Sequence, residues 1–235
     1  MNTVEIIHVI KVLVAFAFLL EASRRDLKSR IVENELWLYM LLTLLPLCFL
    51  EYFLSPFNLL FAAAQAVFVI AFSYAVYWLG LYGGADAKAL MVLAITFPVY
   101  PSFYVFPVLG KGMGMFAFST LANSVIVAPL LVILLFVKNV LKGDLEFPYC
   151  FIGYREKLEN IKFHNLLEYV EGKKVVKRFK GIEADEKELE KLKKAGVREV
   201  WVSPALPFIC FITAGFLVAV FAGNLLYVFI KAILS

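Results

Sequence analysis

The chain has 235 residues, of which 62% are hydrophobic and only 18% are charged, and its formal net charge is +4. Apolar residues make up about half of an ordinary soluble domain, so this composition and a mean hydropathy of +0.83 exclude that class. They indicate a polytopic membrane protein.

Six apolar stretches are candidate membrane helices, because a span needs roughly 20 mostly apolar residues. They cover residues 4–20, 36–54, 57–81, 86–100, 115–137 and 206–230. The fourth stretch is the shortest, and Pro98, Pro101 and Pro107 break the apolar pattern from its end onward. A half-span or re-entrant helix is therefore an alternative to a full crossing at this place.

A polar block over residues 138–203 follows the fifth stretch and is dense in Lys, Arg and Glu. Its pattern predicts a hairpin over 168–179, a charged helix over 185–194 and a strand over 197–202. The expected fold is an all-α polytopic membrane protein of about six transmembrane helices, with a small α+β domain between the fifth and the sixth. The expected boundaries are 1–137 for the first five helices, 138–203 for the soluble domain and 204–235 for the last helix.

The distribution of basic residues predicts the orientation, because Lys and Arg concentrate in cytoplasmic loops. The segment after the first stretch carries four of them, Arg24, Arg25, Lys28 and Arg30, whereas residues 51–56 carry none. Later basic residues also fall on alternate connections, with Lys111 as a single exception. With six crossings and both termini outside, Asp26, Asp86 and the soluble domain are expected on the cytoplasmic side.

The cysteine and histidine residues are scattered along the chain without the spacing of metal ligands: Cys48, Cys150, Cys210, His8 and His164. We expect no metal. Each cysteine is expected to be a small, buried, apolar residue.

Asp86 is the most informative residue, because it lies in a glycine-containing break, 82–88, between two apolar runs. An ionised carboxylate at that depth costs on the order of 2.5–3.5 kcal/mol, which points to a function. Asp26 follows the first apolar run. Two neighbouring carboxylates can share a proton, so that one activates water and the other donates a proton, as in aspartic proteases. Gly83 and Gly84 would permit a positive φ and the close approach of a peptide.

Structural roles and a transport role are the alternatives. Asp86 could be the N-cap of the fourth helix, and Asp26 could lie in a solvated loop and form ordinary surface ion pairs. A transporter could use the same acids as a proton relay. Transporters often have internal repeats with paired broken helices, and this sequence has one such break.

The segment Gly83-Gly84-Ala85-Asp86-Ala87-Lys88, together with Asp26, resembles the archaeal preflagellin peptidases and type IV prepilin peptidases. These are GxGD-type membrane aspartic proteases. The resemblance implies that Asp26 and Asp86 are the catalytic pair, that Gly83, Gly84, Ala85 and Lys88 form the substrate-binding loop, and that no cofactor is needed. It also implies removal of the basic leader of a preflagellin or prepilin at the cytoplasmic face of the lipid bilayer, with no nucleic acid as partner.

The sequence departs from the family pattern in two places. Ala85 stands where the family has glycine, and a positive φ would be costly for alanine. The paired cysteines of many bacterial prepilin peptidases are absent, so we expect peptidase activity without N-methylation. Lys88 is expected to extend to the membrane interface or to stabilise the charged form of the acid pair.

The segment Pro204-Ala205-Leu206-Pro207 resembles the PAL motif of presenilins, which lies at the start of their last helix. A presenilin-like protease that cuts inside transmembrane helices is therefore an alternative. Pro204 could also simply start a helix, where proline is well tolerated. The expected six helices and the interposed soluble domain favour the peptidase of filament precursors.

Overall fold

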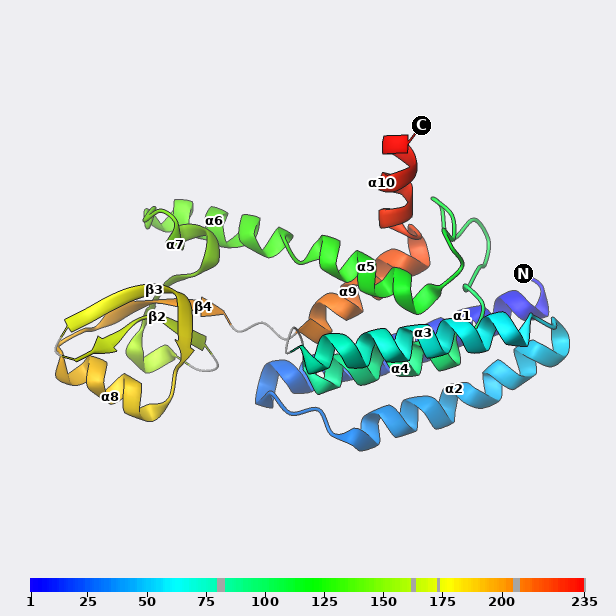
Figure 1. Cartoon of the computed structure of the whole chain (residues 1–235), viewed down its shortest axis with the longest axis horizontal. Helices are drawn as coiled ribbons and strands as arrows, with labels where there is room; N and C mark the ends of the chain where they lie inside the picture. Colours follow the sequence, from blue (N-terminus) through cyan, green and yellow to red (C-terminus); the bar gives the residue numbers. More distant parts are fainter. Residues whose placement is uncertain (80–82, 162–163, 173, 205–207, 235) are drawn as a thin grey trace. The chain divides into compact units, whose positions relative to one another are not determined.

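The computed structural model describes residues 1–79, 83–161, 164–172, 174–204 and 208–234. These residues form two compact units. The helical unit comprises Met1–Val127 and Pro207–Ser235, and the sheet unit comprises Ala128–Leu206 (Figure 1).

Seven helices form the described part of the helical unit. They are α1 (Thr3–Ser29), α2 (Asn34–Leu54), α3 (Leu59–Trp78), α4 (Gly84–Thr96), α5 (Phe116–Val127), α9 (Phe208–Phe221) and α10 (Leu225–Leu234). Helix α9 packs against α5, α1 and α4, and α4 also packs against α2 and α3. The core between them is apolar and includes the buried side chains of Leu19, Met40, Leu90, Phe97 and Phe216.

The described residues contain four helices that are long and apolar enough to cross a membrane, or five if one bent pair is counted as a span. The four are α1, α2, α3 and the stretch Phe116–Lys142, and the bent pair is α9 with α10. The prediction of six spans is therefore not confirmed. Helix α4 has 13 residues, which gives a length of only about 20 Å.

Two helix boundaries differ from the predicted ones for reasons of backbone chemistry. Helix α4 ends at Thr96, because Phe97 precedes Pro98 and takes a non-helical conformation, with φ −120° and ψ 68°. The last helix is bent by 62° between α9 and α10. Gly223 lies in this bend with φ +110°, and a Cβ there would come within 2.1 Å of the Gly110 carbonyl oxygen.

Helix α1 is longer than predicted and continues to Ser29. Ion pairs between Glu21 and both Arg24 and Arg25, at 2.7 and 2.8 Å, support its last turns. The helix ends where Arg30 takes a left-handed conformation with φ 59°. Asp26 therefore lies within a helix, and the expectation of a loop at this position was wrong.

The sheet unit contains a four-stranded antiparallel sheet with the strand order β1-β4-β2-β3. Its strands are β1 (Tyr154–Lys157), β2 (His164–Glu171), β3 (Lys174–Glu183) and β4 (Glu199–Pro204). Its helices are α6 (Leu130–Lys142), α7 (Tyr149–Ile152), the short 3-10 helix η1 (Leu158–Asn160) and α8 (Glu186–Lys194).

The predicted hairpin is confirmed as β2 and β3, which turn at Gly172 with φ +67°. The predicted charged helix is confirmed as α8, and the Asp185 side chain caps it by accepting from the Glu188 N–H. The predicted strand at 197–202 lies two residues later, as β4. Strand β1 was not predicted, because its sequence Tyr-Arg-Glu-Lys has no clear alternation.

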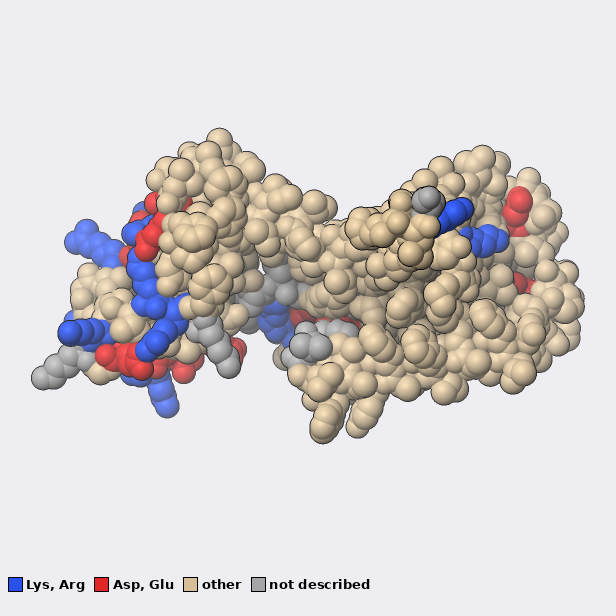
Figure 2. Space-filling view, turned by 45° about the horizontal axis from the view of Figure 1, so that its top comes forward, with Lys and Arg blue, Asp and Glu red and all other residues tan. Residues whose placement is uncertain are grey.

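The sheet unit has its own small apolar core, to which Leu158, Leu166, Leu192, Val200 and Val202 contribute. Charged side chains of both signs gather over the surface of this unit, whereas the surface of the helical unit is mostly uncharged in the same view (Figure 2). An uncharged, apolar surface fits contact with lipid.

Candidate active site

Asp86 is the third residue of α4 and is buried, with 6% of its surface exposed. The N–H of Gly83, the N-cap residue, donates to its Oδ2 atom at 2.9 Å. Its other oxygen, Oδ1, is buried and accepts no hydrogen bond from any residue that the structure describes. Oδ2 thus stabilises the start of α4 by accepting from the N-cap N–H, and Oδ1 is available to accept from another group. Asp86 is not the N-cap itself, so that alternative is wrong in its simplest form.

The glycines before Asp86 act by their small size. Gly83 is extended, with φ −80° and ψ 164°, and Gly84 and Ala85 are helical. The expectation of a positive φ at Gly83 or Gly84 was therefore wrong, and Ala85 carries no strain of that kind. A Cβ on Gly83 would lie 3.3 Å from Asp86 Oδ2, which is a tight contact. Glycine at 83 keeps this approach open.

Asp26 lies in the last two turns of α1 and is partly buried. The ion pairs of this segment join other residues: Arg24 and Arg25 pair with Glu21, and Arg25 also pairs with Glu33 at 2.9 Å. Among the described residues, the Asp26 carboxylate forms no salt bridge. Arg30, four residues later, attracts the Asp26 carboxylate electrostatically without a salt bridge between them in this part of the chain.

Asp26 and Asp86 lie in the same helical unit, on α1 and α4. The carboxylates of Asp26 on α1 and Asp86 on α4 interact electrostatically. Both also interact with the thiol of Cys210, in the first turn of α9. Three helices that are distant in sequence therefore meet at this site.

Sequence reasoning missed Cys210, which it treated as a buried apolar residue, although the thiol is only partly buried. No spacing in the sequence links position 210 to positions 26 and 86. Only the packing of α9 against α1 and α4 brings it there. Cys48 is also only partly buried, whereas Cys150 is buried as expected.

Lys88, which was expected to extend to the membrane interface or to stabilise the charged acid pair, is an exposed residue of α4. Its Nζ donates to Asn34 Oδ1 at 2.5 Å, at the start of α2. No ion pair joins it to either acid among the described residues. Lys88 therefore links α4 to α2. Two other predicted features, Tyr82 and the Ala205-Leu206-Pro207 part of the PAL-like segment, lie outside the described residues.

A second buried polar cluster lies near the other end of α1. Lys11 Nζ donates to Glu51 Oε2 at 2.5 Å, and His8 Nε2 lies 2.9 Å from Glu51 Oε1. All three residues are buried, with at most 5% of their surface exposed. His8 and Asp26 are about 27 Å apart along α1, so this cluster is separate from the acid pair. Lys11 and Glu51 are charged residues inside apolar stretches, and this feature of the sequence could have indicated the cluster.

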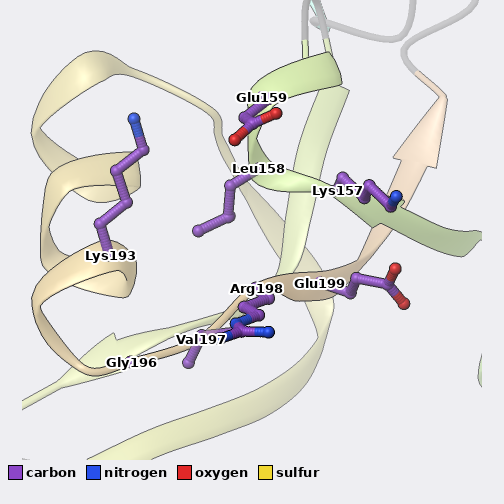
Figure 3. A pocket seen from close by; sticks show the side chains of 8 residues that line it. All are labelled: Lys157, Leu158, Glu159, Lys193, Gly196, Val197, Arg198 and Glu199. Atoms are coloured by element: carbon purple, nitrogen blue, oxygen red, sulfur yellow. The ribbon is translucent and has the colours of Figure 1, made fainter.

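The sheet unit has a hollow of about 770 Å³ between η1, the end of α8 and the start of β4 (Figure 3). Lys193 and Glu159 project from opposite sides of it, and its charges are of both signs. Its charged side chains are exposed. Mixed, exposed charges of this kind are typical of a solvated surface, so we do not assign the chemistry to this hollow.

The fold and the site define a helical membrane protein in which carboxylates from two helices interact beside a third helix. Comparison with known sequences then identifies the family. The profile of the type IV leader peptidase family matches residues 13–137, which include both acids. The profile of the archaeal peptidase A24 C-terminus, type II, matches residues 145–225. The chain belongs to the type IV leader peptidase family and is therefore a peptidase.

Two curated relatives cover most of the chain. The preflagellin peptidase of Methanococcus voltae is 29% identical over 219 residues, which are 88% of this chain and 92% of that protein. The preflagellin peptidase of Methanocaldococcus jannaschii is 28% identical over 219 residues, which are 88% of this chain and 91% of that protein. The resemblance seen in the sequence is thus confirmed at the level of the family.

Proposed function

We propose that this protein is an aspartic endopeptidase of the membrane that removes the leader peptide from preflagellins or type IV prepilins. The observation that carries the proposal is the pair of interacting carboxylates, Asp26 and Asp86, in a chain of the leader peptidase family. The names of the two relatives support preflagellin as a substrate.

The proposed mechanism uses the two carboxylates as one unit with a shared proton. The ionised member takes a proton from a water molecule, whose oxygen attacks the carbonyl carbon of the scissile peptide bond. The protonated member donates to the carbonyl oxygen, which gives a tetrahedral gem-diol intermediate. As this intermediate collapses, the C–N bond breaks, the first carboxyl gives its proton to the leaving amine, and the second carboxylate takes a proton back from a hydroxyl of the gem-diol. The free Oδ1 atom of Asp86 is a suitable acceptor for the water or for the shared proton.

The proposal places the acids at the cytoplasmic face, on the basis of the four basic residues between 24 and 30. These residues surround Asp26 at the end of α1 and suit the headgroup region of the bilayer. The polar block at 138–203 is proposed as a soluble domain on the same side. Membership of a leader peptidase family supports a cut at the leader boundary over a cut inside a transmembrane helix.

The test is cleavage of a tagged archaeal preflagellin by the purified full-length protein, with the new N-terminus of the product sequenced. Asp26→Asn and Asp86→Asn are each expected to abolish cleavage while the protein remains folded, because an amide cannot exchange the proton. Asp144→Asn is the matched control, since Asp144 is an acid of the sheet unit. Its cleavage rate is expected to equal that of the wild type.

Three results would contradict parts of the proposal. Cleavage by either Asn variant would exclude the acid pair. A cut within the hydrophobic segment would favour a presenilin-like protease. The absence of cleavage across several preflagellins and prepilins, with folded protein, would reject the proposed substrates.

A further inference from the structure

A pair of hydroxyl groups joins α1 to α9 beside the acid pair. Ser23 Oγ lies 2.8 Å from Thr213 Oγ1. Thr213 Oγ1 also lies 2.9 Å from the Ile209 carbonyl oxygen and 3.3 Å from the Leu19 carbonyl oxygen. Ser23 is 6% exposed and Thr213 is 7% exposed. The two hydroxyls therefore form a buried polar contact in an interface that is otherwise apolar.

This contact is the last buried one on α1 before Asp26. The buried residues of α1 end at Ser23, and Asp26 follows one helical turn later. Beyond Ser23, Arg25 forms an ion pair with Glu33, whose side chain is 63% exposed. Exposed ion pairs hold a side chain weakly. The hydroxyl pair is therefore a buried contact one helical turn from Asp26, and it can set the position of that residue.

Helix α9 packs against both helices that carry the acids, α1 and α4. Its first turn carries Cys210, whose thiol interacts with Ser23 and with both acids. A rotation of α1 against α9 would move Asp26 relative to Asp86, since the two acids lie on different helices. The hydroxyl pair opposes such a rotation.

We propose that Ser23 and Thr213 are positioning residues, whose hydroxyl pair fixes the rotation of α1 against α9 so that Asp26 faces Asp86. This inference rests on the proposed function, because it assumes that the two acids do the chemistry. Removing the Ser23 hydroxyl deletes one of the hydrogen bonds that join Thr213 to α1, while Thr213 keeps its bonds to the Ile209 and Leu19 carbonyl oxygens. A shift of about 1 Å in a catalytic group can lower a rate by roughly a hundredfold.

The test compares Ser23→Ala and Thr213→Val with the conservative variants Ser23→Thr and Thr213→Ser in the preflagellin cleavage assay. The matched control is Ser124→Ala. Ser124 is a buried serine of α5 next to Gly215 of α9, and its hydroxyl bonds to Thr120 of its own helix. Ser124→Ala therefore also removes a buried hydroxyl that faces α9, but this hydroxyl lies on α5 and not on α1.

We expect Ser23→Ala and Thr213→Val to lower kcat by roughly tenfold to a hundredfold with little change in KM. Both are also expected to move the acid limb of the pH profile of kcat/KM, which reports the acid pair. The variants that keep a hydroxyl should recover most of the rate. Ser124→Ala should leave the pH profile at its wild-type position.

Equal effects of Ser23→Ala and Ser124→Ala would overturn the proposal, as would a loss of rate that follows only the loss of folded protein. Asp86→Asn in the same assay separates this failure from that of the proposed function. If the wild type cleaves and Asp86→Asn does not, an unaffected Ser23→Ala contradicts the positioning role alone.

Discussion

Asp86 has two carboxylate oxygens in unequal surroundings. Oδ2 accepts from the Gly83 N–H, whereas Oδ1 has no hydrogen-bond partner among the described residues. A buried acceptor without a partner costs free energy, and at a catalytic site a water molecule or substrate supplies the missing bond. The structural and the proposed catalytic roles of Asp86 are therefore compatible, because they use different atoms.

Gly83→Ala tests how closely Asp86 must be held. The added Cβ lies 3.3 Å from Oδ2, so the carboxylate must shift by a few tenths of an ångström. The extended backbone at 83 suits alanine, and the protein should fold. We expect a severalfold lower cleavage rate. Gly84→Ala, whose Cβ meets the Tyr77 ring at an ordinary 3.5 Å, should lower the rate less. An equal effect of both changes would contradict this account.

Lys11 and Glu51 form a buried ion pair in the helical unit, with His8 on the other oxygen of the carboxylate. Removing one partner of such a pair leaves an uncompensated buried charge, which costs about 3–5 kcal/mol. Lys11→Met should therefore strongly destabilise the protein, as measured by thermal unfolding in detergent. Lys11→Met/Glu51→Gln should recover part of this loss. If the double variant is less stable than the single one, the ion pair is not the cause.

At the scale of elements, a network of charges joins the strands of the sheet unit. Glu146 Oε2 accepts from Trp201 Nε1 on β4 at 3.0 Å, and its Oε1 accepts from Lys177 Nζ on β3 at 2.5 Å. The bond from Lys177 is the main cause that holds the pKa of Glu146 below its usual value. The ionised carboxylate thus ties the strands to the segment that precedes α7.

This lowered pKa predicts how stability depends on pH. The unfolded state binds the proton of Glu146 at about pH 4.3, and the folded state binds it only at a lower pH. The stabilisation is thus complete above the unfolded pKa and is lost as pH falls through the folded one. Acid unfolding of the full chain, followed by Trp201 fluorescence after Trp37→Phe and Trp78→Phe, should be less steep in Glu146→Gln. An unchanged slope would show that Glu146 does not contribute.

At the scale of the whole helical unit, the short α4 has a consequence for topology. Asp86 interacts with Asp26 near one end of α1, and Ser102 contacts His8 near the other end, with its N–H 3.2 Å from Nδ1. Residues 86–102 therefore follow α1 over about 27 Å, close to the ~30 Å of the hydrocarbon core. We expect this segment to cross the membrane, with the residues after α4 completing the path.

Labelling of single cysteines tests this crossing. In a chain with its native cysteines replaced by alanine, Lys28→Cys and Tyr104→Cys should react with a membrane-impermeant maleimide from opposite sides. Both positions are exposed, Tyr104 at 75%. Lys28→Cys should react in inside-out vesicles and Tyr104→Cys in intact cells. Reaction of both from the same side would establish a re-entrant segment instead.

The two acids of the candidate site could be predicted from the sequence, but the contacts that surround them could not. Asp26 and Asp86 stand out because acids near apolar runs are rare and costly, and the motif around Asp86 led to the correct family. The contacts of Cys210, Ser23, Thr213 and Lys88 depend on which helices pack together. The half-burial of Cys210 and the contact of Lys88 with Asn34 could not be predicted for this reason.

The membrane class, most of the apolar helices, the β2–β3 hairpin and α8 could be predicted from the sequence, because composition, periodicity, turns and caps are local properties. Tertiary contacts fix the bend at Gly223, the pairing of β1 with β4 and the electrostatic interaction between two acids 60 residues apart. These features depend on contacts between distant segments. Their free energy comes from packing and hydrogen bonds that no local pattern records.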